Sequence, residues 1–536
     1  MPHVIPLDGH RTVVSVLREA AQRNSGHEAY VEPRQPGGRT RRAMTFGEWD
    51  RAADGVAGLL AGLGVEKGDV VCLLLPSSID YAVLYAALLR LGAITSGINP
   101  RLGKGEVDSI LRRTEPVLVI HEPSGSELLA AASSRLMLCA DVMIARTGDP
   151  PVNRPDLSAH HPVAVVWTSG TTGDPKGAVF DHANLAAVAR GTDVLSQPGD
   201  RRLSPLPFAH VGYMTRAWDE IAHAVTTVIT PTPWRAEDAV RILEEESITV
   251  AQGVPTQWAL MLEVESLARA DLSALRVAGT GAARMPATQV AAVRARLGVP
   301  VVVRYTSTEA SLGTGTTLSS TDDEVATTVG RPLPGVEMQI VDDRGTPVER
   351  GSVGRVLLRS GATMRGYWGR GPGRGRKADE LIDHAATTTV LSDDGWLTTG
   401  DFGLIDEKGN LHLSGRAHER YIRGGYNVYP AEVEEALSTH EAVFRVAVVG
   451  APDPVLGEIG VAVVVTQGDH PLDLSELRTH CGRTLSDYKA PDALVIVDEL
   501  PLTPMMKVDP HRLAALAESA AEERRSSKAR ERRRPA

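Results

Sequence analysis

Hydrophobic and polar residues follow one another along this chain in a strand-then-helix order. The run VVCLLL at residues 70–75 is apolar throughout, as is typical of a buried strand, and apolar residues recur at helical spacing over 81–91. Further buried strands are predicted at 117–120, 163–167 and 301–304. This alternation indicates an α/β protein, in which ligands bind where the strands of an open sheet end.

Helix and loop signals organise the middle of the chain. Thr45 and Glu48 have the spacing of a capping box, and they precede an apolar-periodic stretch that ends near Gly64. After about residue 330, Gly, Pro and Asp separate short alternating runs, which predicts a meandering β subdomain. Residues 371–380 are rich in glycine and charge, so we expect an exposed loop there.

A small α/β unit closes the chain. Its predicted elements are a helix at 431–440 and strands at 444–450 and 459–466. The expected fold is therefore α/β, with a large N-terminal body of several α/β and β subdomains and a small C-terminal α+β domain. Basic residues crowd the end of the chain, where we expect a disordered, solvated tail, with a contact to an acidic partner as the alternative. The predicted boundaries are 1–415 for the body, 416–515 for the small domain and 516–536 for the tail.

Composition narrows the functional classes. The chain of 536 residues has 57 Lys and Arg against 67 Asp and Glu, and this formal charge of -10 argues against a general nucleic-acid-binding protein, because such proteins carry a basic surface. Cys72, Cys139 and Cys481 are an odd number at wide spacing, so neither a disulfide framework nor a zinc site is indicated. The N-terminus lacks a signal-peptide pattern, and the apolar stretch at 81–94 contains Arg90 and is too short to span a membrane. We expect a cytoplasmic protein with reduced thiols.

The segment VAVVWTSGTTGDPKG, residues 163–177, has the composition of an anion-binding loop. A predicted strand leads into two glycines, whose backbone can turn its N–H groups toward a ligand, and into hydroxyl side chains and a lysine. It is not a Walker A loop, because Lys176 is followed by Gly177 rather than by Ser or Thr. From composition alone, a flexible turn between strands is an equal alternative. The candidate anion ligands are Thr168, Ser169, Gly170, Thr171, Thr172, Gly173 and Lys176.

The stretch TSGTTGDPKG also matches, residue for residue, the phosphate loop of the adenylate-forming superfamily, which includes acyl-CoA synthetases, peptide-synthetase adenylation domains and firefly-type luciferases. Further motifs of the family follow in the same order. YTSTE at 305–309 resembles the Tyr-Gly-x-Thr-Glu element, and WLTTGD at 396–401 resembles the Thr-Gly-Asp element. LSGRAHERYIRGGYNVYPAEVEE at 413–435 resembles the hinge and the loop after it, and PLTPMMK at 501–507 ends on the near-terminal lysine. The sequence is identified as a member of this superfamily over almost its whole length.

The resemblance implies a two-step reaction on a carboxylic acid. The carboxylate attacks the α-phosphorus of ATP and pyrophosphate leaves; the thiol of coenzyme A then displaces AMP from the acyl-AMP. Glu309 is implied to hold Mg2+, and Thr308 to contact the α-phosphate. Lys507 is implied to bridge the carboxylate and the α-phosphate, with Lys176 neutralising phosphate charge. Without the resemblance, Glu309 is an acid in a polar loop and Lys507 a solvated lysine.

The resemblance also assigns residues to the nucleoside. Taken alone, Asp401 is a turn residue after Gly400, and residues 281–283 are an ordinary passage from a strand to a turn. The implied ligands are Tyr305, stacked on adenine; Gly281, Ala282 and Ala283, on the other side of the base; Asp401, bound to the ribose hydroxyls; and Arg416, which reaches the ribose or a phosphate.

In this family the small domain changes orientation between the two half-reactions. The pivot corresponds to His418, where many members have Asp or Lys, and Gly424 and Gly425 are implied to flank the channel for CoA. Thr306 is a second departure, because it replaces the usual glycine beside the reaction centre. We expect Thr306 either to narrow the acyl pocket or to change how the nucleotide is bound.

The segment that follows residue 205 bears on the choice of acid. In peptide-synthetase domains an Asp just after the position of His210 pairs with the amino group of the substrate, but this chain has Val211 there, and Asp219 does not match that position. A buried ammonium without a counter-ion is costly, so we expect a plain fatty, alicyclic or aromatic acid. For each pocket candidate, loop packing is an equal alternative. The expected border of the acyl pocket is Phe208, His210, Val211, Tyr213 and Met214.

The predicted function is an AMP-forming acid–thiol ligase that uses ATP, Mg2+ and coenzyme A. One alternative is a stand-alone ligase that loads the phosphopantetheine of a carrier protein, and another is a nucleotide-binding scaffold that no longer catalyses. The first is favoured because the candidate lysines and acids are all present and no carrier domain is fused to the chain. The expected partners are small molecules, without nucleic acid or a membrane span, and the sequence is compatible with a homodimer.

Overall fold

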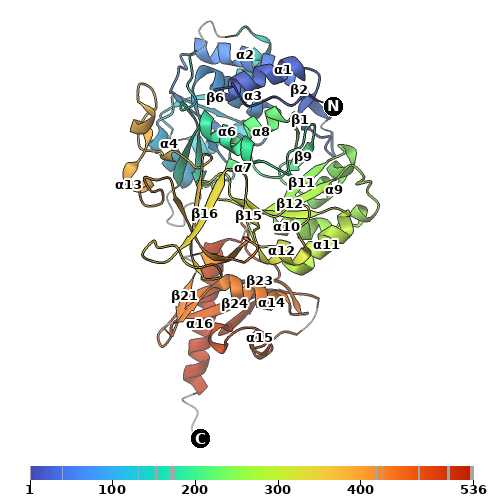
Figure 1. Ribbon diagram of the computed structural model, residues 1–536, viewed down its shortest axis with the longest axis vertical. Coiled ribbons are helices and arrows are strands. Elements are labelled where there is room, and N and C mark those ends of the chain that lie inside the picture. Colours follow the sequence, from blue (N-terminus) through green and yellow to red (C-terminus); the bar gives the residue numbers. More distant parts are fainter. Residues whose placement is uncertain are drawn as a thin grey trace.

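Four sheets organise the part of the chain that the structure describes. The structure is a computed structural model, and it describes residues 2–38, 40–130, 132–150, 155–168, 175–416, 420–424, 426–468, 471–503 and 508–531. Two large α/β layers hold the N-terminal half, and a small antiparallel sheet follows them. The last sheet, coloured orange to red, lies at the opposite end of the molecule from the N-terminal helices (Figure 1).

The first sheet has seven strands in the order β18-β8-β7-β4-β3-β5-β6. Its centre is parallel, and β8 and β18 add to one edge in antiparallel fashion. The capping box predicted at Thr45 and Glu48 is confirmed, since the Thr45 side chain accepts from the Glu48 amide and the Glu48 carboxylate accepts from the Thr45 amide. The strands are β3 Val70–Leu74, β4 Ile94–Ile98, β5 Leu118–His121, β6 Arg135–Leu138, β7 Pro162–Thr168, β8 Lys176–Asp181 and β18 Gly366–Tyr367. The helices beside them are α1 Val13–Arg23, α2 Phe46–Gly62, α3 Ile79–Leu91, α4 Lys104–Thr114, α5 Cys139–Met143 and α6 His182–Gly191.

The second sheet has nine strands in the order β15-β14-β13-β12-β11-β9-β10-β1-β2. Its interior pairs are parallel, so β11, β12 and β13 end at the same edge. Its strands are β1 Glu28–Glu32, β2 Arg42–Thr45, β9 Arg201–Ser204, β10 Thr226–Ile229, β11 Val250–Gly253, β12 Val277–Gly281, β13 Val301–Tyr305, β14 Thr314–Gly315 and β15 Arg331–Pro332. Its helices are α7 Val211–Met214, α8 Ala217–Ala222, α9 Ala236–Glu245, α10 Pro255–Leu262, α11 Ala287–Leu297 and α12 Asp322–Thr327.

The third sheet is the β subdomain that the sequence predicts after residue 330. Its four strands are antiparallel neighbours in the order β16-β17-β19-β20. The glycine-rich segment at 371–380 is largely exposed, although Gly373 is buried against Gly68. The elements are β16 Val336–Val341, β17 Gly354–Ser360, α13 His384–Thr387, β19 Leu397–Ile405 and β20 Leu411–Arg416.

The C-terminal unit corrects one prediction. Helix α16, Pro510–Glu531, occupies most of the segment that we expected to be disordered, so the prediction is wrong as far as residue 531. The helix forms because Leu513, Ala517 and Ala521 recur at four-residue spacing and are buried against the sheet. The other elements are β21 Tyr421–Arg423, β22 Tyr426–Val428, α14 Pro430–Ser438, β23 Val443–Asp453, β24 Gly457–Thr466, α15 Leu474–Cys481 and β25 Ala493–Ile496.

The predicted fold class is confirmed: the chain is a mixed α/β protein with a large N-terminal part and a small C-terminal unit. Within the described ranges, no helix is both long enough and apolar enough to cross a membrane.

Candidate active site

Lys176 and Glu309 both contact one tyrosine, Tyr367. The backbone of Lys176 pairs with Thr168 across the ends of β7 and β8, so these residues form the base of the predicted phosphate loop. The Lys176 ammonium lies 5.2 Å from the ring centroid of Tyr367, in cation–π range. The Tyr367 hydroxyl donates to Oε1 of Glu309 at 2.8 Å. The structure therefore brings together a phosphate-loop cation and the carboxylate assigned to the metal.

Tyr367 is fixed by its own strand. It lies on β18, opposite Ala178 of β8, and its side chain is buried. Burial and the neighbouring Glu309 carboxylate raise the pKa of Tyr367, so its hydroxyl stays protonated and donates to the carboxylate. The Met364 amide also donates to the Glu309 carbonyl at 2.8 Å, which ties the turn after β13 to the segment before β18.

Glu309 is the residue for which metal binding is predicted at this point. No cluster of three or more His, Cys, Asp or Glu side chains suited to a metal ion occurs among the residues that the structure describes. Mg2+ is commonly held by one or two carboxylates together with substrate phosphates and water. A single anchored carboxylate beside the phosphate loop fits such a site. Thr308, the residue before Glu309, is half-buried in the same turn.

The residues assigned to the nucleoside lie at the ends of β12, β13 and β19. The Tyr305 hydroxyl, at the end of β13, donates a short hydrogen bond to Oδ2 of Asp401 on β19. Gly281 pairs with Arg304, and a Cβ at Gly281 would lie 2.6 Å from the Arg304 carbonyl oxygen, so only glycine fits. Ala282 follows with a φ of 67°, a left-handed conformation that is uncommon outside glycine and that recurs at functional sites.

The small unit meets this region through two connections. Arg416 of β20 stands opposite Asp401 in the strand register, although its side chain is not described. Arg284, just after Ala283, forms an ion pair of 2.6 Å with Glu435 on α14. Both connections place the small unit beside the proposed nucleoside ligands. The predicted residues Ser169, Gly170, Thr171, Thr172, Gly173, His418, Gly425 and Lys507 lie outside the described residues.

Gly424 directly follows strand β21. Its φ of 58° is left-handed, and its amide donates to the Leu456 carbonyl at 2.7 Å. The preceding residue, Arg423, donates twice to the carboxylate of Asp492, at 2.6 and 2.9 Å. The described part of the glycine loop is therefore held from behind by β24 and by a buried acid.

The expected acyl-pocket residues divide into two groups. His210 and Val211 are half-buried at the start of α7, and the Asn99 amide nitrogen lies 3.3 Å from Nε2 of His210. Tyr213 is only 4% exposed: its ring stacks on Phe208 with centroids 3.6 Å apart, and its hydroxyl lies 3.0 Å from that of Tyr30. Tyr213 thus belongs to a packed aromatic cluster, and its contact with an acyl group stays a prediction.

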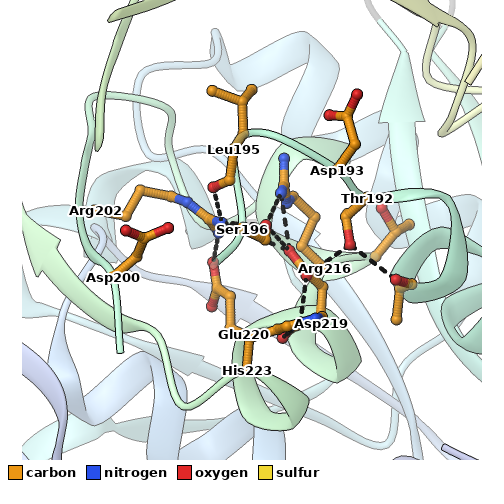
Figure 2. Close-up of polar contacts among 12 residues, drawn as sticks. Thr192, Asp193, Leu195, Ser196, Asp200, Arg202, Arg216, Asp219, Glu220 and His223 are labelled. Atoms are coloured by element: carbon orange, nitrogen blue, oxygen red, sulfur yellow. Dashed lines mark hydrogen bonds and ion pairs between the residues drawn. The ribbon is translucent and has the colours of Figure 1, made fainter. Parts of the chain in front are cut away.

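Asp219 is fully buried and its two oxygens are occupied (Figure 2). Thr192 donates to one oxygen at 2.9 Å, while Ser196 and Arg216 donate to the other, each at 2.8 Å. Both Arg202 and Arg216 converge on the Ser196 hydroxyl in Figure 2. Asp219 is therefore a structural acid, unsuited to pair with the ammonium of an amino-acid substrate.

The neighbouring cations keep Asp219 ionised although it is buried. Burial alone would raise the pKa of Asp219, but Arg216, His223 and Arg202 together hold it well below its usual range. In the same cluster, burial raises the pKa of Glu220. Asp219 accordingly remains the anion that compensates the buried guanidinium of Arg202 and the partly buried one of Arg216.

Sequence reasoning missed Tyr367. A single tyrosine between Gly366 and Trp368 carries no motif, and its partners Lys176 and Glu309 are far away along the chain. Only the pairing of β18 with β8 brings it to the site. The missed residue thus depends on strand pairing between distant segments.

Comparison with protein families matches two parts of the chain. Residues 17–368 match the family described as AMP-binding enzyme, and residues 432–507 match the AMP-binding enzyme C-terminal domain. The long-chain-fatty-acid–CoA ligase FadD13 of Mycobacterium tuberculosis is 31% identical over 506 residues, covering 92% of this chain and 96% of that protein. The indoleacetate–CoA ligase of Aromatoleum aromaticum is 32% identical over 483 residues, covering 87% and 92%.

Solved structures agree with these matches. The ATP-bound structure of MatB from Rhodopseudomonas palustris superposes with a TM-score of 0.82 at 26% identity, covering 95% of this chain and 99% of that one. The similarity therefore spans both the large and the small parts of the molecule. The chain belongs to the AMP-binding enzyme family and includes the C-terminal domain of that family.

Proposed function

We propose that the protein is an AMP-forming carboxylic acid:CoA ligase that acts through an acyl-AMP intermediate. The observation that carries this proposal is the convergence of Lys176 and Glu309 on Tyr367, together with the separate Tyr305–Asp401 pair. A phosphate-binding cation, a metal-binding carboxylate and a ribose-binding carboxylate are the groups that nucleotide activation of an acid requires. The relatives that are named CoA ligases support the same reaction.

In the first half-reaction, a carboxylate oxygen attacks the α-phosphorus and pyrophosphate leaves. Two anions must meet, so charge neutralisation dominates the barrier. Lys176 binds phosphate oxygens, and its ammonium is held over the Tyr367 ring. Thr308 contacts the α-phosphate and Lys507 bridges it to the attacking carboxylate. Asp401 accepts from the ribose, and Tyr305 stacks on the base.

Glu309 would hold Mg2+, which when bound would neutralise part of the triphosphate charge. The contribution of this chain is to keep the carboxylate in place. Tyr367 donates to one carboxylate oxygen and the Met364 amide fixes the backbone carbonyl of the same residue. Through these two contacts, Glu309 is held in a defined position.

In the second half-reaction, the thiol of CoA attacks the acyl carbonyl and AMP leaves with the bridging oxygen. The small unit, which we place at residues 416–515, turns about His418 between the two steps. It then presents the loop at Gly424 and Gly425 to the pantetheine chain. The left-handed backbone at Gly424 is compatible with a glycine loop against which a narrow ligand lies.

The acid is a plain carboxylic acid without an α-amino group. Val211 supplies no counter-ion, and the acid nearest to it along the chain, Asp219, is fully buried and already paired with Arg216. A fatty, alicyclic or aromatic acid meets the aromatic cluster of Phe208 and Tyr213 at less cost than an ammonium does.

The test supplies a panel of fatty, alicyclic, aromatic and amino acids with ATP, Mg2+ and CoA. AMP and an acyl thioester should form in equal amounts with at least one plain acid, and chelation of Mg2+ should abolish both products. The proposal is refuted if no acid yields a thioester, or if only α-amino acids are adenylated.

A further inference from the structure

The C-terminal helix α16 is anchored to the sheet of the small unit by more than apolar contacts. Leu513, Ala517 and Ala521 face β23, β24 and β25, and one turn later the same face presents Arg524. The Arg524 side chain is only 18% exposed. A charged side chain that is mostly buried needs groups of opposite charge beside it, and Arg524 pairs with two acids.

Arg524 bridges two acids that are almost completely buried. One guanidinium nitrogen donates to Oδ2 of Asp453 at 3.1 Å, and the other donates to Oδ1 of Asp492 at 3.4 Å. The side chains of Asp453 and Asp492 are 8% and 3% exposed. Such pairs are costly to break, because removing one partner leaves buried charge without compensation.

Hydrogen bonds connect both acids to the glycine loop. Asp492 accepts two hydrogen bonds from Arg423, the residue before Gly424, in a bidentate pair. Asp453 accepts from the amides of Val455 and Leu456, each at 3.0 Å. The Leu456 carbonyl in turn accepts from the Gly424 amide at 2.7 Å. Two routes of direct contacts thus join Arg524 to consecutive residues of the loop.

We propose that Arg524 is a positioning residue for thioester formation: through Asp453 and Asp492, it holds Arg423 and Gly424 in the conformation that receives the acceptor thiol. This inference rests on the proposed function, in which the glycine loop flanks the CoA channel. Arg524 touches no substrate itself. Its effect belongs to the transfer step, because its contacts lead to Arg423 and Gly424, whereas Lys176, Glu309 and Asp401 lie in the large N-terminal part.

The local geometry predicts what removal of the guanidinium does. Asp492 keeps Arg423 and an ion pair of 3.8 Å with Arg478, so the small unit still folds. Asp453 loses its ion pair with Arg524, and the turn at Val455 and Leu456 is then less constrained. A loosened loop misplaces the thiol, and small errors in placement lower a transfer rate strongly.

The experiment compares Arg524→Ala with Arg524→Lys and with a control, Arg512→Ala, which removes an exposed arginine of the same helix. Acyl-AMP formation without CoA and thioester formation from supplied acyl-AMP are measured separately. We expect Arg524→Ala to adenylate within about twofold of the wild type and to form thioester about tenfold more slowly. Arg524→Lys, which keeps the charge but not the two-point contact, should fall between them, and Arg512→Ala should match the wild type.

Hydrogen exchange of the unliganded protein supplies a second readout. The amides of Ile422, Arg423 and Gly424 should exchange at least about fivefold faster in Arg524→Ala than in Arg512→Ala. If Arg524→Ala does not fold, Asp453→Asn, which keeps an acceptor for the turn amides but loses the charge, should give the same pattern.

Equal losses in both half-reactions, or an unchanged transfer rate, would overturn the inference. If the wild-type protein forms no acyl-AMP with any acid, the proposed function fails instead. In that case hydrogen exchange still tests whether Arg524 holds the glycine loop. Unchanged exchange of the loop amides in Arg524→Ala would overturn that link.

Discussion

The hydroxyl of Tyr367 offers a sharp test of how the site holds Glu309. Tyr367→Phe removes the donor to Oε1 of Glu309 and keeps the ring beneath the Lys176 ammonium. A hydrogen bond to a charged group contributes about 1.5–3 kcal/mol. Glu309 is half-buried, so water replaces part of the lost contact, and we expect a net loss of about 1–1.4 kcal/mol. This corresponds to a five- to tenfold slower adenylation, since about 1.4 kcal/mol is tenfold in rate.

The assay is pyrophosphate exchange or acyl-AMP formation over a range of Mg2+ concentrations. Because the change acts through the carboxylate assigned to the metal, the deficit should shrink as Mg2+ is raised. Tyr367→Leu is the matched comparison, as it also removes the ring and costs Lys176 a further contribution of about 0.5–1 kcal/mol. Adenylation by Tyr367→Phe at the wild-type rate at every Mg2+ concentration would refute the role given to Tyr367.

Three further predictions concern other parts of the molecule. Lys507→Ala should abolish adenylation yet largely spare thioester formation from supplied acyl-AMP, and equal loss of both steps in the separated assays would contradict its assigned role. Asp219→Asn should lower the free energy of unfolding in urea by about 3–5 kcal/mol, because Arg202 and Arg216 lose their buried counter-ion; a loss below about 1 kcal/mol would count against this picture. Because the pKa of Asp219 is lowered in the folded protein, its carboxylate stabilises the fold above the unfolded pKa of about 4, and this stabilisation is lost as the pH falls. The stability of the Asn variant should therefore depend less on acid pH than that of the wild type in unfolding scans. Burial raises the pKa values of the thiols of Cys72, Cys139 and Cys481 to about 11, 12 and 11. The native protein should therefore resist a thiol reagent at neutral pH, while the unfolded chain reacts at all three positions. Rapid labelling of the native protein would contradict the burial of these thiols.

Local signals predicted the fold well where the determining residues are neighbours in sequence. The capping box at Thr45 and Glu48 depends on a three-residue spacing, and the buried strand at β3 depends on a continuous apolar run; both are confirmed. The C-terminal tail was misjudged because charge was weighed above periodicity. Leu513, Ala517 and Ala521 already have helical spacing, and they bury one face of a helix whose other face carries the charges.

The candidate site divides in the same way. The sequence motifs predicted four residues that act together: Lys176, Glu309, Tyr305 and Asp401. In the structure, Lys176 and Glu309 both contact Tyr367, and Tyr305 contacts Asp401. Tyr367 could not be found by the same reasoning, because its contacts require distant strands to pair. The roles of Asp219 and Arg524 likewise depend on which side chains meet inside the fold, and no spacing along the chain encodes that.

Attack of a carboxylate oxygen on the α-phosphorus of ATP is the step on which the proposed function depends. The most direct measurement uses an acid substrate with both carboxylate oxygens labelled with 18O, together with ATP, Mg2+ and CoA, and determines the mass of the nucleotide product. The AMP should carry one 18O, because the bridging oxygen of the acyl-AMP leaves with AMP when the thiol attacks. Unlabelled AMP, or label found instead in inorganic phosphate beside ADP, would contradict it.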